Sequence, residues 1–225
     1  MKLKTNHSEF QNEIDNRGIE YLIHFTPTIN LLSIFEQESI ISRKRLFEIG
    51  EYNDEFEIHD YVDYMDAQRL DNLTDYINLS IQFPNYFLLN VFRKRHSFAH
   101  YQWCILKINP KYIYSDETLF SVCNAASNAA HTIGIDGSIE KFRNMFASSL
   151  NIGGKIRSRG GLKNKYTTDV QAEVLVQNSI PLTDIVEVCF ENELTLNSNI
   201  SAFNISGFDT SKFKVDSSLF TNNRI

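Results

Sequence analysis

The clearest strand pattern in the chain runs from Thr168 to Gln177, where successive side chains alternate between two faces. Both faces are rich in Val, Ala and Leu, which predicts a strand inside a sheet. Glu173 interrupts the middle of this apolar run, and Gln171 lies two residues earlier on the same face. Because a buried carboxylate is costly unless it is paired or used, Glu173 is a candidate functional residue. The alternative is an edge-strand carboxylate that forms a salt bridge with a nearby lysine.

Other apolar runs predict short strands with helices between them. Strands are expected at residues 20–26, 77–83, 103–108 and 185–190, and helices at residues 8–16, 30–38, 85–95 and 137–150. The helix at 85–95 carries Phe87, Leu88, Val91 and Phe92 at helical spacing. The helix at 137–150 is expected to turn Ile139, Phe142, Met145 and Phe146 inward. The mixed order has no regular strand–helix–strand period and predicts an α+β fold.

Four stretches are less regular. Residues 1–19 are polar and predict a frayed start, and Arg43–Arg45 predicts a solvated turn. Residues 48–76 are acidic and irregular, and residues 192–225 predict one or two edge strands or a loose tail. At 225 residues the chain fits one domain, residues 1–225, with a core at about 20–190.

The charge distribution is uneven. The formal net charge of −6 argues against a protein that coats nucleic acid indiscriminately. One segment opposes this trend: residues 155–165 hold five cations, no acid and two adjacent glycines. The cations are Lys155, Arg157, Arg159, Lys163 and Lys165. The segment predicts a flexible loop that is either a solvated surface turn or an arm that contacts phosphates beside Glu173.

Several classes of site lack support in the sequence. The three cysteines are widely spaced, which fits a reducing, cytoplasmic location better than a disulfide framework. No His or Cys spacing matches a metal site, so no metal is expected. No apolar run approaches the roughly 18 residues of a membrane span, and no glycine-rich nucleotide loop is present.

Four further residues offer binding chemistry. His24 and Thr26 lie on one face at the end of the first predicted strand, where they suit a sugar or an amide, although a lone His beside apolar neighbours is more often a satisfied core residue. Arg69 suits a phosphate, or it belongs to a surface ion-pair cluster with the nearby acids. Tyr86 could stack on a ring or simply pack.

Taken in order, a set of motifs resembles the DarT family of bacterial DNA ADP-ribosyltransferase toxins. The motifs are His24-x-Thr26, Asn30-Leu31, Arg69-Leu-Asp71, Ser80-Ile-Gln-Phe-Pro-Asn-Tyr86, Trp103-Cys-Ile-Leu106, Asn124-Ala-Ala-Ser127 and Gln171-Ala-Glu173. The match covers roughly residues 20–190. The Ser80–Tyr86 stretch is similar to the branch that modifies guanine rather than thymine.

The resemblance implies an ADP-ribosyltransferase fold with a split central sheet and peripheral helices that holds NAD as co-substrate. His24, Thr26, Asn30, Tyr86 and Arg69 would contact NAD, with Arg69 also near the reacting centre. Glu173 would be the catalytic glutamate. Gln171 and the five cations of residues 155–165 would seat single-stranded DNA. The family works with a macrodomain antitoxin, DarG.

Other functions remain open on sequence alone. The same fold could use another acceptor, such as RNA, a tRNA 2′-phosphate or a protein side chain. A non-catalytic module that binds nucleic acid or an antitoxin is also compatible with these residues.

Overall fold

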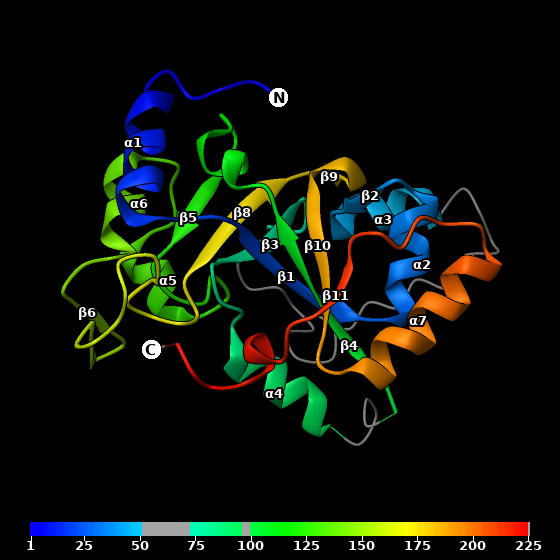
Figure 1. Cartoon of the computed structure of the whole chain (residues 1–225). Coiled ribbons are helices and arrows are strands. Elements are labelled where there is room, and N and C mark those ends of the chain that lie inside the picture. The colour runs from blue at the N-terminus through cyan, green and yellow to red at the C-terminus, as the bar shows by residue number, and fades with distance from the viewer. Residues whose placement is uncertain (51–72, 96–99, 225) are drawn as a thin grey trace.

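The computed structural model describes residues 1–50, 73–95 and 100–224 (Figure 1). Within these residues, seven strands form one sheet in the order β11-β10-β4-β1-β3-β8-β5. These strands are β1 (Leu22–Pro27), β3 (Tyr76–Ile81), β4 (Trp103–Ile108), β5 (Leu119–Ser121), β8 (Glu173–Gln177), β10 (Ile185–Phe190) and β11 (Phe213–Val215). Most neighbours are antiparallel, and β10 and β11 are parallel. Two smaller sheets pair β2 (Ser39–Ile41) with β9 (Ser179–Pro181) and β6 (Ser149–Ile152) with β7 (Lys155–Ser158).

The large sheet is weakly joined at its centre. Strands β1 and β4 pair over the full length of β1, from Leu22 to Pro27. In contrast, β1 and β3 pair only at Leu22 with Ile81 and at Ile23 with Ser80. The second half of β1 therefore runs apart from β3, and the expected split of the central sheet lies here.

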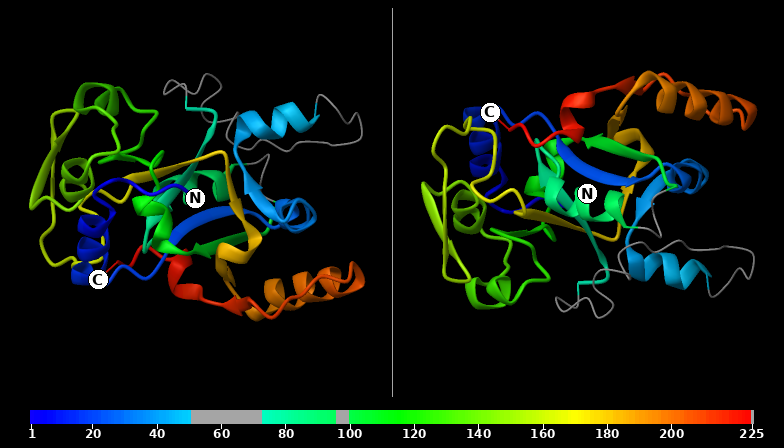
Figure 2. Two further views of the ribbon diagram at one scale, coloured as in Figure 1. Left: turned by 90° about the horizontal axis from the view of Figure 1, so that it is seen from above. Right: turned by 90° about the horizontal axis from the view of Figure 1, so that it is seen from below.

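The helices surround this sheet (Figures 1 and 2). They are α1 (His7–Arg17), α2 (Ile29–Glu36), α3 (Arg43–Gly50), α4 (Tyr86–Lys94), α5 (Asn128–Ile133), α6 (Ile139–Asn144) and α7 (Glu193–Ile205). Figure 2 shows α7 at one end of the molecule and the segment containing β6 and β7 at the other. The prediction of an α+β fold is confirmed.

Strand alternation divides the core into two apolar clusters. On β4, Cys104 and Leu106 face the larger cluster, while Trp103 and Ile105 face the smaller one. The larger cluster receives side chains from α1, α2, α6 and α7, and the smaller one receives Leu89 and Phe92 of α4. Both faces of β4 are consequently buried, as expected of a central strand that is apolar throughout.

Some predictions about elements were wrong. The helix predicted at residues 8–16 is confirmed as α1, but the start of the chain is not frayed, because Phe10 and Ile14 of α1 are buried in the larger cluster. Arg43–Arg45 opens helix α3 instead of forming a turn. In α4, Phe92 is buried and Leu88 packs against the smaller cluster, but Phe87 and Val91 are exposed, so the four residues at helical spacing do not form one buried face. Helix α6 ends at Asn144 and residues 149–152 form strand β6, so the helix predicted at 137–150 is shorter than expected.

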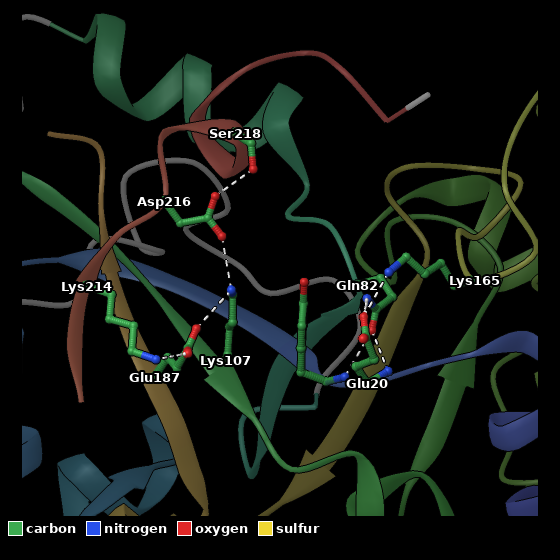
Figure 3. Close-up of polar contacts among 9 residues, drawn as sticks. Glu20, Gln82, Lys107, Lys165, Glu187, Lys214, Asp216 and Ser218 are labelled. Carbon is green, nitrogen blue, oxygen red and sulfur yellow. Dashed lines mark hydrogen bonds and ion pairs between the residues drawn. The ribbon is translucent and has the colours of Figure 1, made fainter. Parts of the chain in front are cut away.

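The C-terminal region is also more ordered than expected. Residues 192–225 contain helix α7 and the edge strand β11, and a polar cluster holds the segment after β11 in place (Figure 3). Lys107 of β4 bonds Glu187 and Asp216 at 3.0 Å each. Burial disfavours the charged form of Lys107, but the hydrogen bonds to Asp216 and Glu187 outweigh burial and raise its pKa. The chain after β11 is thereby anchored to the centre of the sheet.

The contribution of α1 to stability can be measured. Phe10 is 0% exposed and its ring contacts Phe120 and Phe142, whereas Phe87 is 51% exposed. We expect Phe10→Ala to lower the free energy of unfolding by about 3–5 kcal/mol, because it leaves a cavity in the core. Urea denaturation checks this, with Phe87→Ala as the matched control, for which we expect a change within about 0.5 kcal/mol. Equal losses in the two variants would contradict the assignment of α1 to the core.

Candidate active site

Glu173 is the first residue of β8, and not the middle of a longer strand as predicted. Residues 169–172 form a turn, and β8 begins between β3 and β5, with Glu173 opposite Ser121. The apolar alternation before Glu173 reflects burial rather than strand structure, because Val170 and Ala172 are buried inside the turn. The carboxylate is thus placed at the end of a central strand, next to a turn.

The carboxylate of Glu173 is buried and hydrogen-bonded. The residue is 5% exposed, and its Oε2 accepts from the backbone N of Ala125 at 2.9 Å. The same oxygen accepts from Nδ2 of Asn78 at 3.2 Å. Hydrogen bonds of this kind offset the cost of burying an ionised carboxylate. They also fix the orientation of the side chain, so the interpretation as an edge-strand salt bridge with a lysine finds no support in the described contacts.

His24 is connected to the same group through Asn78. Its Nδ1 lies 3.1 Å from the backbone O of Asn78. Because a carbonyl only accepts, Nδ1 carries the proton and Nε2 is the acceptor in the neutral ring. Burial of the ring lowers the pKa of His24, and the bond to Asn78 opposes this effect only in part. His24, Asn78 and Glu173 therefore form a continuous hydrogen-bonded path across β1, β3 and β8.

Thr26 and Asn30 are held together beside this path. Thr26 follows His24 on the same face of β1, and its Oγ1 accepts from Nδ2 of Asn30 at 2.9 Å. Asn30 lies in the first turn of α2, so this bond joins the end of β1 to the start of the helix. The structure thus brings together His24, Thr26, Asn30 and Glu173 in the neighbourhood of the split sheet.

The Ser80–Tyr86 segment leaves β3 through a strained residue. Gln82 has φ +61°, in the left-handed region that residues other than glycine rarely adopt. Its Oε1 accepts from the backbone N of Glu20 at 2.6 Å and of Tyr21 at 3.0 Å (Figure 3). These bonds fix the segment that leads to Tyr86. Tyr86 is partly buried at the start of α4, and its ring centroid lies 4.3 Å from that of Phe87.

The segment with five cations is a hairpin followed by a braced turn, and not a flexible loop throughout. Lys155 and Arg157 belong to strand β7, which pairs with β6. Nε of Arg157 lies 3.3 Å from Oδ2 of Asp169. Arg159 donates to the backbone O of Tyr166 at 2.6 Å and of Lys163 at 2.8 Å.

Lys165 is also engaged within the protein, since its Nζ lies 2.8 Å from Oε2 of Glu20 (Figure 3). In the described part of the chain, Lys155 and Lys163 are the exposed members of the five that form no salt bridge. Arg69 falls outside the described residues. No cluster of three or more His, Cys, Asp or Glu suited to a metal occurs in the described ranges.

Sequence reasoning missed three residues of this site. Asn78 lies with Ser80 on the polar face of β3, where an Asn is normally a solvated residue, so the alternation alone does not single it out. Ala125 contributes only its backbone N, so its side chain gives no signal. Asp169 is 5% exposed and bonds Arg157, and its burial became visible only with the fold.

The fold agrees with comparisons to known proteins. Residues 23–221 match the sequence model of the family described as "ssDNA thymidine ADP-ribosyltransferase, DarT". This chain belongs to the DarT family. No curated protein is significantly similar to the chain in sequence. The family prediction from the ordered motifs is therefore confirmed, while the guanine-modifying branch stays a prediction.

Solved DarT structures share the fold at low sequence identity. DarT from Thermus sp. 2.9 in complex with ADP-ribosylated ssDNA has a TM-score of 0.58 and 13% identity, covering 91% of this chain and 97% of that one. The same protein in complex with NAD+ has a TM-score of 0.55 and 13% identity over 89% and 96% of the two chains. Thermosipho africanus DarTG in complex with ADP-ribose has a TM-score of 0.58 and 16% identity, and the match covers 89% of this chain and 51% of that chain. None of the helices in the described ranges is long and apolar enough to cross a bilayer.

The lowered pKa of His24 predicts a pH dependence of stability. The folded state favours the neutral ring, so stability falls as the pH drops below about 6.5, where the unfolded chain takes up the proton first. We expect His24→Gln to flatten this decline, because Gln cannot titrate. Urea denaturation at about pH 7.5 and about pH 5.5 measures the difference.

His131 is exposed on α5 and provides the matched control. His131→Gln should leave the decline between the two pH values as steep as in the unsubstituted protein. If the free energy of unfolding falls equally in His24→Gln and in the control between the two pH values, the fold does not hold His24 in its neutral state.

Proposed function

We propose that this DarT-family chain transfers ADP-ribose from NAD to a base in single-stranded DNA, with Glu173 as the catalytic residue. The observation that carries the proposal is the position of Glu173. It is a buried carboxylate at the end of a central strand, oriented by the backbone N of Ala125 and linked through Asn78 to His24. Membership of the DarT family supports the same activity.

The chemistry suits a fixed carboxylate. Transfer breaks the bond between the ribose C1′ and the nicotinamide nitrogen, forms a bond from C1′ to a nitrogen of the base, and releases a proton from that base. Positive charge develops on the sugar during this exchange, as in glycoside hydrolysis. A carboxylate that bonds the ribose 2′-hydroxyl stabilises this charge, and its effect is greatest when it is oriented beforehand. Ala125 and Asn78 provide that orientation for Glu173.

The NAD half of the site would lie along the split between β1 and β3. His24 offers Nε2 as an acceptor because Nδ1 is committed to the backbone O of Asn78. A neutral imidazole with this tautomer suits a ribose hydroxyl or an amide N–H. Thr26 and Asn30, joined to each other by a hydrogen bond, would contact the same half, and Tyr86 would pack against a ring. Arg69 is assigned to the phosphates by the resemblance alone.

The DNA half would lie over the turn before Glu173 and the hairpin of β6 and β7. Lys155 and Lys163 are exposed and would meet phosphates directly, whereas Arg159 and Lys165 bond other parts of the chain. Gln171, two residues before Glu173, would contact the target base. Single strands are the favoured substrate because an unstacked base is required. The structure of a relative with ADP-ribosylated ssDNA supports this acceptor.

For the base we propose guanine, on the similarity of Ser80–Tyr86 to the guanine-modifying branch. The family description names thymidine, which is therefore the direct competitor. We further propose a macrodomain antitoxin of the DarG type as partner, since a similar fold occurs within a chain named DarTG. Fragmentation of the modified oligonucleotide by mass spectrometry identifies the base.

The proposed activity is tested by mass spectrometry of mixed-sequence single-stranded DNA incubated with NAD and the protein. We expect the mass of one ADP-ribose to be added to the oligonucleotide. Glu173→Gln should lower the rate by about 100- to 1,000-fold, because it removes the charge that stabilises the transition state. NAD binding by the variant, measured by calorimetry, should be nearly unchanged.

The other results select other functions. Modification of RNA or protein in place of DNA would keep the enzyme class and change the acceptor. If NAD neither binds nor turns over, the chain is a binding module and the proposal fails. If Glu173→Gln retains full activity on DNA, the assignment of the catalytic residue is wrong.

The salt dependence of DNA binding tests the two exposed lysines. Each contact between a lysine and a phosphate of a single strand contributes about −0.7 to the slope of log affinity against log salt. We expect Lys155→Gln and Lys163→Gln each to make the slope shallower by about this amount. Lys2, which is exposed and pairs with Asp116 near the N-terminus, is the control, and Lys2→Gln should leave the slope unchanged. Identical slopes in all variants would remove the hairpin and its loop from the DNA site.

A further inference from the structure

The turn that precedes Glu173 is unusually well anchored. Thr167, Thr168 and Asp169 are all buried, although they are polar residues in a loop. Thr168 donates its backbone N to the O of Met145 at 2.8 Å, and its hydroxyl bonds the O of Ala147. These bonds fix the turn to the chain that follows α6. The alternation of residues had indicated only a strand in this stretch.

Asp169 organises the turn from inside. Its Oδ1 accepts from the backbone N of Gln171 at 2.7 Å, which fixes the residue expected to meet the target base. Its backbone O accepts from the hydroxyl of Thr167 at 2.6 Å and from the N of Ala172 at 3.3 Å. One buried aspartate therefore determines the course of the chain on both sides of Gln171.

Two arginines from distant parts of the sequence meet at this turn. Arg157 of β7 places Nε 3.3 Å from Oδ2 of Asp169. Arg224, close to the end of the chain, donates to the O of Thr167 at 3.0 Å. Burial lowers the pKa of Arg224, and the nearby charge of Asp169 acts in the opposite direction. The hairpin and the C-terminal segment are thus tied to the residues that lead to Gln171.

Glu173 is anchored separately. Its carboxylate bonds Ala125 and Asn78, neither of which belongs to the turn or contacts Asp169 through a described hydrogen bond. Loosening the turn should therefore disturb Gln171 more than the carboxylate of Glu173. This separation distinguishes the half of the site that meets the acceptor from the half that meets NAD.

We propose that Asp169 is a positioning residue for the acceptor: it holds Gln171 and ties Arg157 of the hairpin to the turn, so that DNA is presented to Glu173. This role rests on the proposed transfer to DNA. Arg157 then acts mainly as a brace for the turn, in contrast to Lys155 beside it, which stays available to phosphates. The ion pair couples the position of the hairpin to that of Gln171.

The experiment compares Asp169→Ala, Asp169→Asn and Arg157→Gln with the unsubstituted protein. Asp169→Asn keeps an oxygen that can accept from Gln171 but loses the charge that faces Arg157, so its defect should be smaller than that of Asp169→Ala. We expect Asp169→Ala to lower kcat/KM for the oligonucleotide by about tenfold to 100-fold, because misplacement by about 1 Å has effects of that size. The Kd for NAD should stay within about twofold, since Glu173 and His24 keep their own anchors.

A matched control separates this role from general destabilisation. Asp209 is exposed, and its Oδ1 accepts from the backbone N of Ser211 at 2.9 Å, the same local bond that Asp169 makes with Gln171. Asp209→Asn should match the unsubstituted protein in every measurement. Arg157→Lys, which keeps the charge, should restore part of the activity that Arg157→Gln loses.

Each outcome has a defined meaning. If the unsubstituted protein modifies no DNA, the proposed function fails before the variants are compared. If it modifies DNA and Asp169→Ala does so equally well, only the positioning role fails. If the affinity for NAD and the Tm of Asp169→Ala and Asp169→Asn fall in proportion to their activity, Asp169 is merely structural and the proposal is overturned. The proposal is supported if only kcat/KM for the oligonucleotide falls, and falls further in Asp169→Ala than in Asp169→Asn.

Discussion

The burial of one carboxylate governs the arrangement of this molecule. Glu173 is 5% exposed, and an ionised group in such a place requires hydrogen bonds that do not depend on water. They come from the backbone N of Ala125, after β5, and from Asn78 on β3. The strand order β3-β8-β5 brings both donors to the end of β8. The orientation of the carboxylate therefore depends on this order of strands.

The split sheet follows from the same arrangement. If β1 and β3 paired along their whole length, the backbone O of Asn78 would be occupied by β1. Because they pair only at two positions, that O accepts from Nδ1 of His24 instead. The histidine thus replaces a strand contact and acquires a defined tautomer. Where the pairing of β1 and β3 stops, Asn78 therefore bonds His24 through its backbone O and Glu173 through its side chain.

The parts of this structure that depend on local pattern could be predicted from the sequence. Apolar runs identified β3, β4 and β10 nearly to their ends, and the spacing of Ile139 and Phe142 identified the inward face of α6. The strand prediction failed before Glu173, where a buried turn has the same apolar alternation as a strand. Val170 and Ala172 are apolar because the turn is buried, and nothing in the local sequence distinguishes that from strand alternation. Phe10 likewise lies in a polar stretch, and only its neighbours from β5 and α6 explain its burial.

The candidate site was predictable to a similar degree. Glu173, His24 and Thr26 were predicted as site residues because their chemistry is unusual for their positions. Asn78 was not, since an Asn in an alternating strand is normally a solvated residue, and Ala125 acts through its backbone alone. Identifying either required knowing which strands are neighbours, and that information is not local.

The basic segment shows why a count of charges overstates a binding surface. Five cations follow one another in sequence, yet Arg159 bonds two carbonyls and Lys165 bonds Glu20. Arg157 faces a buried aspartate. A cation that already has a partner gains less from a phosphate, because the existing bond must be given up. The paired members of the segment therefore shape the turn that leads to Glu173. Its two exposed lysines, Lys155 and Lys163, leave local positive charge on the surface of a chain whose net charge is −6. Attraction of a nucleic acid would be concentrated at one place, beside Glu173.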